Sequence, residues 1–273
     1  MRRPSIEIPL IQASFVELEH ILGWLEERRQ RSASQRVLLV GGWAVHMYNA
    51  YYGSYDIDLL MNSTTKKSLE HHLTSKRGYR KDDHPFMGPK GVVLDTPAGG
   101  VHLDTAAIDG LDRFEGVPAV LDLSSVADSH QSLDLGDVTV PVPERSRLLL
   151  MKLKAAWDRG WRLDNGTSRD PDRERGKLVK DLADVLALVD PASGGREVDF
   201  VFLGAQLERY PFLADTLGSA GRDPRGVEFY GKLDMTMASG AVEEILRLVG
   251  RPRGPGRMEG GRAGLSGQPN YTR

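Results

Sequence analysis

Apolar residues recur every three to four positions in several stretches of the chain, which predicts amphipathic helices. Short apolar runs at other places predict buried strands. The helical stretches are 14–31, 64–77, 145–159, 176–189, 198–217 and 238–249, and the strand-like runs are 37–40, 56–61, 91–94 and 101–108. Strands and helices interleave in the first half, while the second half is mainly helical. This order predicts an α+β (α/β) fold, a sheet flanked by helices with a helical C-terminal part.

Polar residues mark the expected starts of some elements. Ser14 with Glu17 three positions later matches a capping box. Ser63 or Thr64 is the expected cap of the helix at 64–77. Residues 110–136 carry no clear periodicity, and 137–143, with two prolines, predicts a short extended segment.

The stretch 37–61 holds the densest chemistry. The first strand ends in Gly41-Gly42, and the next strand-like run begins Asp56-Ile57-Asp58. Side chains alternate along a strand, so the two aspartates share a face. Two carboxylates on one face repel each other unless a positive group lies between them, and a divalent metal is the usual solution.

Each half of this pattern also has a plainer interpretation. Gly41-Gly42 alone is typical of a turn that ends a strand, and Asp56 and Asp58 alone suit a solvated strand end. Taken together, with a short helix between them, they resemble the signature of the nucleotidyltransferase superfamily, the DNA polymerase β-like group. The resemblance implies a nucleotidyltransferase-fold mixed sheet flanked by helices.

Asp104 lies in the apolar strand-like run 101–108. By itself it is equally well a polar residue on a solvated strand face. The resemblance implies instead that it is a third carboxylate, on a strand beside that of Asp58. His102 shares its face by alternation and would border the site without serving as a ligand.

Two later helices extend the resemblance. Val-Pro-Val-Pro ends at Pro143, a Leu-rich helix carries Lys152 and Lys154, and Lys180-Asp181 is followed by Asp184. This order resembles the C-terminal part of AbiEii/AbiGii-type nucleotidyltransferases, toxin components of toxin–antitoxin and phage-defence pairs. It implies that Lys152, with Lys154 as the weaker choice, contacts nucleotide phosphates and that Lys180 and Asp181 lie beside the active site. Each of these residues alone also suits a solvated helix face.

One departure concerns the residues before Asp56. Relatives often carry Arg-x-Thr/Ser-x-Asp there, whereas this chain has Tyr52-Gly53-Ser54-Tyr55-Asp56, which keeps the serine and lacks the arginine. The contact that the arginine makes is then absent or supplied elsewhere.

The resemblance implies nucleotidyl transfer from an NTP, with two Mg²⁺ ions as cofactor and Mn²⁺ as the alternative. Asp56 and Asp58 would hold both ions, and Asp104 would ligate one and serve or position the base. Gly41 and Gly42 let backbone approach the phosphates. Ser54, Lys152, Lys180 and Asp181 complete the predicted nucleotide site.

Composition and charge bear on which partners the protein is expected to have. The 273 residues have a net charge of −2, no cysteine and no apolar run long enough to span a membrane. The N-terminal residues lack the apolar stretch of a signal peptide. These features favour a soluble, cytoplasmic protein without a membrane partner. Between 144 and 181 there are eleven Lys or Arg against seven Asp or Glu, a modest excess that is compatible with an RNA acceptor such as tRNA.

The expected organisation is a catalytic domain at 1–142, a helical domain at 143–250 and a disordered Gly/Arg-rich tail at 251–273.

Besides RNA, a hydroxyl group of a protein is a candidate acceptor of the nucleotide. The resemblance to toxin components implies a cognate antitoxin as partner. Two further hypotheses stay open. One is a nucleotidyltransferase that acts on a small molecule, as antibiotic-modifying enzymes do. The other is a non-catalytic nucleotide-binding module of the same fold.

Overall fold

A computed structural model describes residues 8–29, 36–84, 88–136 and 138–250. The tail predicted at 251–273 lies outside these residues, as do the last two residues of the first predicted helix.

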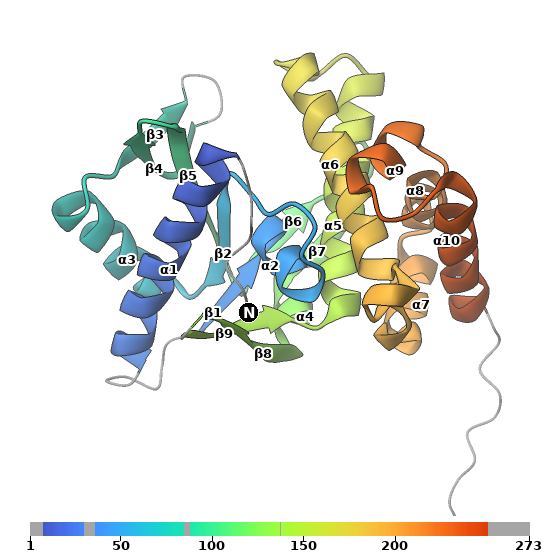
Figure 1. Cartoon of the computed structure of the whole chain (residues 1–273), viewed down its shortest axis with the longest axis horizontal. Coiled ribbons are helices and arrows are strands. Elements are labelled where there is room, and N and C mark those ends of the chain that lie inside the picture. Colours follow the sequence, from blue (N-terminus) through green and yellow to red (C-terminus); the bar gives the residue numbers. More distant parts are fainter. Residues whose placement is uncertain (1–7, 30–35, 85–87, 137, 251–273) are drawn as a thin grey trace, which may run out of the picture.

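A five-stranded sheet forms the centre of the N-terminal half, in the order β1-β2-β5-β4-β3. Only β2 and β5 pair in parallel, and the other neighbours are antiparallel, so the sheet is mixed. The predicted mixed sheet flanked by helices is confirmed (Figure 1). Its strands are β1 (Val37–Val40), β2 (Ile57–Met61), β3 (Arg80–His84), β4 (Gly88–Thr96) and β5 (Gly99–Ala107).

Helices accompany the sheet and make up the C-terminal part, as predicted. Figure 1 shows α5 and α6 side by side between the sheet and the last helices. The helices are α1 (Pro9–Arg29), α2 (Gly41–Tyr48), α3 (Ser63–Lys76), α4 (Leu123–Ala127), α5 (Arg145–Asp164), α6 (Pro171–Val189), α7 (Phe200–Arg209), α8 (Phe212–Ala220), α9 (Pro224–Tyr230) and α10 (Met235–Val249). None of these helices is both long and apolar enough to cross a membrane.

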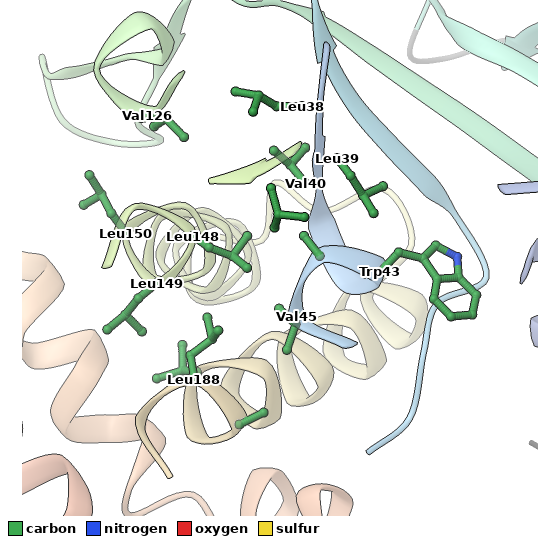
Figure 2. Packing of buried hydrophobic residues seen from close by; sticks show 14 of the residues in the cluster. Leu38, Leu39, Val40, Trp43, Val45, Val126, Leu148, Leu149, Leu150 and Leu188 are labelled. Carbon is green, nitrogen blue, oxygen red and sulfur yellow. The ribbon is translucent and has the colours of Figure 1, made fainter. Parts of the chain in front are cut away.

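The core lies where β1 and α2 meet α5 and α6. Leu39 of β1 and Leu148 and Leu149 of α5 are fully buried, and Leu188 of α6 packs in the same cluster (Figure 2). Burying one such side chain stabilises the fold by about 1.5–3 kcal/mol. Because α2 follows β1 without a loop, this packing fixes the position of Gly41 and Gly42 relative to α6.

The predicted capping box at Ser14 was wrong. Helix α1 begins at Pro9, so Ser14 lies inside it, fully buried, and accepts a hydrogen bond from the indole Nε1 of Trp43. Glu17 binds Arg77 and Tyr79. Both polar side chains therefore serve tertiary contacts, which local spacing does not reveal. The cap of α3 is likewise Asn62 and neither Ser63 nor Thr64.

Other boundaries also moved. Helix α6 begins at Pro171, five residues before the predicted start, because Asp170 accepts a hydrogen bond from the Arg173 amide and caps the first turn. The predicted helix 198–217 divides into α7 and α8 at Tyr210–Pro211, since proline disfavours helical backbone in the residue before it.

The hydrophobic pattern did not predict several short helices and strands. Residues 110–136, expected to be loop-rich, contain α4 and three strands, and β8 pairs with β9 at the predicted extended segment. These strands are β6 (Leu111–Arg113), β7 (Val120–Asp122), β8 (His130–Leu135) and β9 (Val138–Pro143). Three-residue strands are too short to show alternation. β3 and α9 were not predicted either.

Candidate active site

A cavity of about 750 Å³ lies between the sheet and the helices α5, α6 and α9. Its lining includes all nine residues predicted for the site: Gly41, Gly42, Ser54, Asp56, Asp58, Asp104, Lys152, Lys180 and Asp181. A smaller cavity of about 220 Å³ lies beside α1, β1, β8 and β9 and contains none of them. The larger cavity is therefore the candidate site.

Two of the predicted carboxylates lie on neighbouring strands. In the parallel pair of β2 and β5, Asp58 is directly opposite Asp104. Asp56 lies one residue before β2, where it also lines the cavity. The predicted adjacency of the two aspartate-bearing strands is thus present.

The protonation of Asp58 depends on its burial and on the other two carboxylates. Burial, together with the negative charges of Asp104 and Asp56, raises the pKa of Asp58 to about 6. Burial would also raise the pKa of Asp56, but the ammonium of Lys177 holds it below the usual value. The Lys177 Nζ lies 2.9 Å from a carboxylate oxygen of Asp56. Asp58 and Asp104 thus form a like-charged pair, which a bound cation would stabilise.

Gly41 is required where β1 passes into α2. Its φ is +69°, and a Cβ at this position would lie 1.8 Å from a carboxylate oxygen of Asp58. Only glycine accepts both the left-handed backbone and this close approach. The helix start therefore rests against the buried carboxylate.

Gly42 lies beside two polar side chains. A Cβ on Gly42 would lie 2.8 Å from both the Lys180 Nζ and the Ser54 hydroxyl. The first amides of a helix have no partner within the helix and attract anions. A lysine and a hydroxyl beside such amides are suited to a phosphate group.

Lys152 lines the cavity, and its ammonium is engaged by two carboxylates. Its Nζ lies 2.7 Å from Asp184 and 3.2 Å from Asp181, and only 7% of the residue is exposed. Lys180 also binds Asp184, at 2.9 Å, and Tyr51 donates a hydrogen bond to the same carboxylate. These contacts join α5 to α6 at the cavity wall. Lys152 therefore connects the charged residues Asp181 and Asp184 of α6, and it binds these carboxylates in place of a phosphate.

The weaker candidates have other contacts. Lys154 is buried and pairs with Asp158 at 2.6 Å and with Asp112 at 3.0 Å, at the part of the cavity made by α5 and β6. His102 lines the cavity, as expected from the face that it shares with Asp104.

Sequence reasoning missed the basic face of α6 that precedes Lys180. Arg173 and Lys177 line the cavity together with Lys180, and their spacing of four and three residues places them on one face of the helix. Arg159 of α5 also lines it and binds Asp181 at 2.6 Å. A helix start placed at Gly176 hid the spacing. The proline at 171 with Asp170 before it was the signal that could have revealed it.

The residues fit a hard divalent cation in kind. Asp56, Asp58 and Asp104 offer the oxygen ligands that Mg²⁺ and Mn²⁺ take. Burial is the main cause of the raised pKa of Asp58, and the charges of Asp104 and Asp56 contribute to it. Within the described ranges, however, no three Asp, Glu or His side chains are grouped closely enough to hold an ion as they stand. Asp56 is bound to Lys177 instead.

Comparisons with known proteins concern the fold. No family model matches the chain, and no curated protein resembles it in sequence. Among solved structures, an antigenic nucleotidyltransferase-like protein from Paracoccidioides brasiliensis is 14% identical, with a TM-score of 0.41 over 78% of this chain and 94% of that one. The antibiotic-resistance factor ANT(2'')-Ia is 13% identical, with a TM-score of 0.40 over 73% and 95%.

A third solved structure, of a protein from Thermotoga maritima, is 12% identical, with a TM-score of 0.34 over 65% of this chain and 98% of that one. At such low identities and scores, these structures add no support for a function. Support for a function comes from the cavity's own residues.

Proposed function

We propose that the chain is a metal-dependent nucleotidyltransferase that moves a nucleoside monophosphate from an NTP to a hydroxyl group. One observation carries the proposal: Asp58 faces Asp104 across β2 and β5, with Asp56 beside them, in a cavity whose other wall is the basic face of α6. Carboxylates opposite cations suit a metal-bound polyphosphate, because the metal meets the acids and the phosphate oxygens meet the bases.

In this proposal Asp56, Asp58 and Asp104 hold the divalent ions. When bound, the ions would neutralise phosphate charge and favour ionisation of the attacking hydroxyl. The Gly41–Gly42 backbone, Ser54 and Lys180 bind phosphate oxygens, and Arg173 and Lys177 supply the charge that the missing arginine would otherwise bring. Lys152 and Asp181 hold α5 and α6 in place for these contacts.

The transfer itself needs one bond formed and one broken. The acceptor oxygen bonds to the α-phosphorus, the bond from that phosphorus to the bridging oxygen breaks, and pyrophosphate leaves. Asp104 takes the acceptor's proton or positions the group that does. The carboxylate is suited to this because it lies opposite Asp58 on the cavity wall.

The finer proposal is an AbiEii-like toxin whose acceptor is RNA, such as tRNA, or a protein, paired with a cognate antitoxin. It rests on the order of motifs in the sequence and on the basic excess of α5 and α6. A small-molecule acceptor is the alternative, which the polar cluster of Lys154, Asp112 and Asp158 at the cavity wall favours.

Label transfer tests the reaction. Purified protein is incubated with Mg²⁺, each α-labelled NTP in turn, and total RNA or cell extract. We expect label on one class of macromolecule with the native chain and none with Asp56→Ala. Label that appears only on a small molecule would favour the alternative acceptor. Absence of both transfer and Mg²⁺-dependent NTP binding would leave only a non-catalytic module of this fold.

A further inference from the structure

We propose that Tyr52, Tyr55 and Phe229 form an aromatic platform that stacks against the nucleobase of the NTP. This inference rests on the proposed function and adds to it a subsite for the base. The three side chains line the same cavity as the aspartates, and each is partly exposed. None of them has a role in the metal or phosphate contacts described above.

The rings of the platform are inclined to one another. The ring centres of Tyr52 and Phe229 are 4.7 Å apart with planes inclined by 59°, and those of Tyr52 and Tyr55 are 6.1 Å apart with planes inclined by 89°. Neither of these two pairs is therefore stacked face to face. The two tyrosine hydroxyls are 2.6 Å apart and satisfy each other, so polar ends need not point at a ligand.

The surrounding contacts hold the platform in one arrangement. Tyr230, next to Phe229, is buried and is bound by the amide of Asn49 and by Asp190. Lys232 donates to the Asn49 side chain at 2.6 Å and to the Ala50 carbonyl at 3.1 Å. These bonds tie α9 to the segment that follows α2. Rings held in advance lose little freedom on binding, which favours affinity.

The platform adjoins the proposed phosphate contacts. Ser54 lies between Tyr52 and Tyr55 in the chain, and its hydroxyl lies over Gly42. Helix α9, which carries Phe229, packs on α6, which carries Lys177 and Lys180. The cluster of Lys154, Asp112 and Asp158 comes from α5 and β6 instead. The ring against Lys154, that of Phe114, is buried and is not part of the cavity lining. An NTP with its phosphates at Gly42 and Lys180 therefore has aromatic surface beside it for its base.

Stacking explains what such a platform would recognise. Every nucleobase has a π-face, so aromatic rings bind bases with little dependence on their identity. The platform would raise the affinity for any NTP over that for its phosphates alone. Selection among the four bases would need hydrogen-bonding groups, and these three rings, with their hydroxyls paired, do not provide them.

Calorimetry with two ligands separates the base from the phosphates. The full-length protein with Mg²⁺ is titrated with α,β-methylene ATP, which cannot be cleaved at the α-phosphorus, and with inorganic tripolyphosphate. We expect Tyr52→Leu and Phe229→Leu each to weaken binding of the ATP analogue roughly tenfold, the usual size of one stacking contact. Binding of tripolyphosphate should not change.

Tyr52→Phe is the matched control, because it keeps the ring and removes only the hydroxyl, and it should bind the analogue as the native chain does. The platform is refuted if both leucine variants bind the analogue with native affinity, or if the analogue binds no more tightly than tripolyphosphate to the native protein. Equal weakening of both ligands would refute it too. If the native protein binds neither ligand, the proposed function itself fails.

Discussion

Lys177 donates a hydrogen bond of 2.9 Å from its ammonium Nζ to a carboxylate oxygen of Asp56, and so links α6 to the loop before β2. The lysine side chain is 38% exposed and that of the aspartate 22% exposed. The pair thus lies at the edge of the cavity, where a bound cation and this ammonium would compete for the same carboxylate. Lys177 then stands between the metal and the phosphates.

The first prediction follows from that competition. We expect Lys177→Met to tighten binding of Mn²⁺ to the nucleotide-free protein by roughly fivefold, about 1 kcal/mol, since a partly exposed ion pair contributes on that order. The same variant should bind tripolyphosphate more weakly, because a phosphate-binding cation is lost. Calorimetry measures both. Arg175→Met is the control, as Arg175 pairs with exposed Asp172 on the same helix. An unchanged or weaker Mn²⁺ affinity would contradict the competition.

Gly41 provides a second prediction. Gly41→Ala should lower the free energy of unfolding by at least about 1 kcal/mol, because alanine resists a φ of +69° and its Cβ would strike Asp58. Activity should fall with it, since Asp58 must move. Gly160→Ala in α5, where nothing lies within 4 Å, should be neutral or stabilising by up to about 1 kcal/mol. Chemical denaturation compares the two. Equal effects would mean that the contact with Asp58 is unimportant.

The third prediction concerns Asp184. It is fully buried and binds both Lys152 and Lys180. Asp184→Asn leaves Lys152 short of one counter-charge in a buried place, and we expect a loss of about 3 kcal/mol in unfolding free energy. Glu70→Gln, which breaks the partly exposed pair with Lys66, should cost less than ~1 kcal/mol. Chemical denaturation measures both losses of unfolding free energy. A loss in Asp184→Asn as small as that in Glu70→Gln would argue against a buried network.

The fourth prediction concerns pH. Burial, together with the charges of Lys180 and Lys232, lowers the pKa of His46 from 6.5 to about 4. The unfolded chain therefore binds this proton first, so the stabilisation is complete above pH 6.5 and is lost as pH falls toward 4. The loss should be on the order of 3 kcal/mol.

The control for this effect is His46→Leu, which removes the titrating ring and keeps an apolar group against Trp43. Unfolding free energies measured from pH 4 to 8 should vary less in the variant than in the native chain. Carboxylates titrate in both proteins and cancel in the comparison. If the two curves are parallel, His46 does not contribute to the pH dependence.

Much of the fold and site was visible in local pattern. Short apolar runs identified β1, β2 and β5, and alternation along the strand placed Asp56 and Asp58 on one face. The place of Asp104 on the neighbouring strand came from the family resemblance. Gly41 was visible because a strand-to-helix passage of this kind requires glycine. Such signals are local, and one sequence carries them.

The remainder depends on tertiary contacts. Lys177 approaches Asp56 across 121 positions of the chain, and no local pattern encodes that pairing. Lys152 looked like a cation facing the phosphates, yet Asp181 and Asp184 one helix away bind it. Ser14 and Glu17 matched a capping box because hydrogen-bonding residues at that spacing also occur inside a helix. Short strands such as β6 form only because their partners are present.

The central claim is that the carboxylates of the cavity bind a divalent metal. The most direct test measures Mn²⁺ binding by calorimetry or electron paramagnetic resonance, with and without α,β-methylene ATP. The native chain is compared with Asp58→Asn and with Asp95→Asn, an exposed aspartate of β4 that pairs with Arg80. We predict that the analogue tightens Mn²⁺ binding to the native chain and to Asp95→Asn, and that Asp58→Asn loses at least about tenfold in affinity, or 1.4 kcal/mol. Native Mn²⁺ affinity in Asp58→Asn would contradict a metal site at these carboxylates.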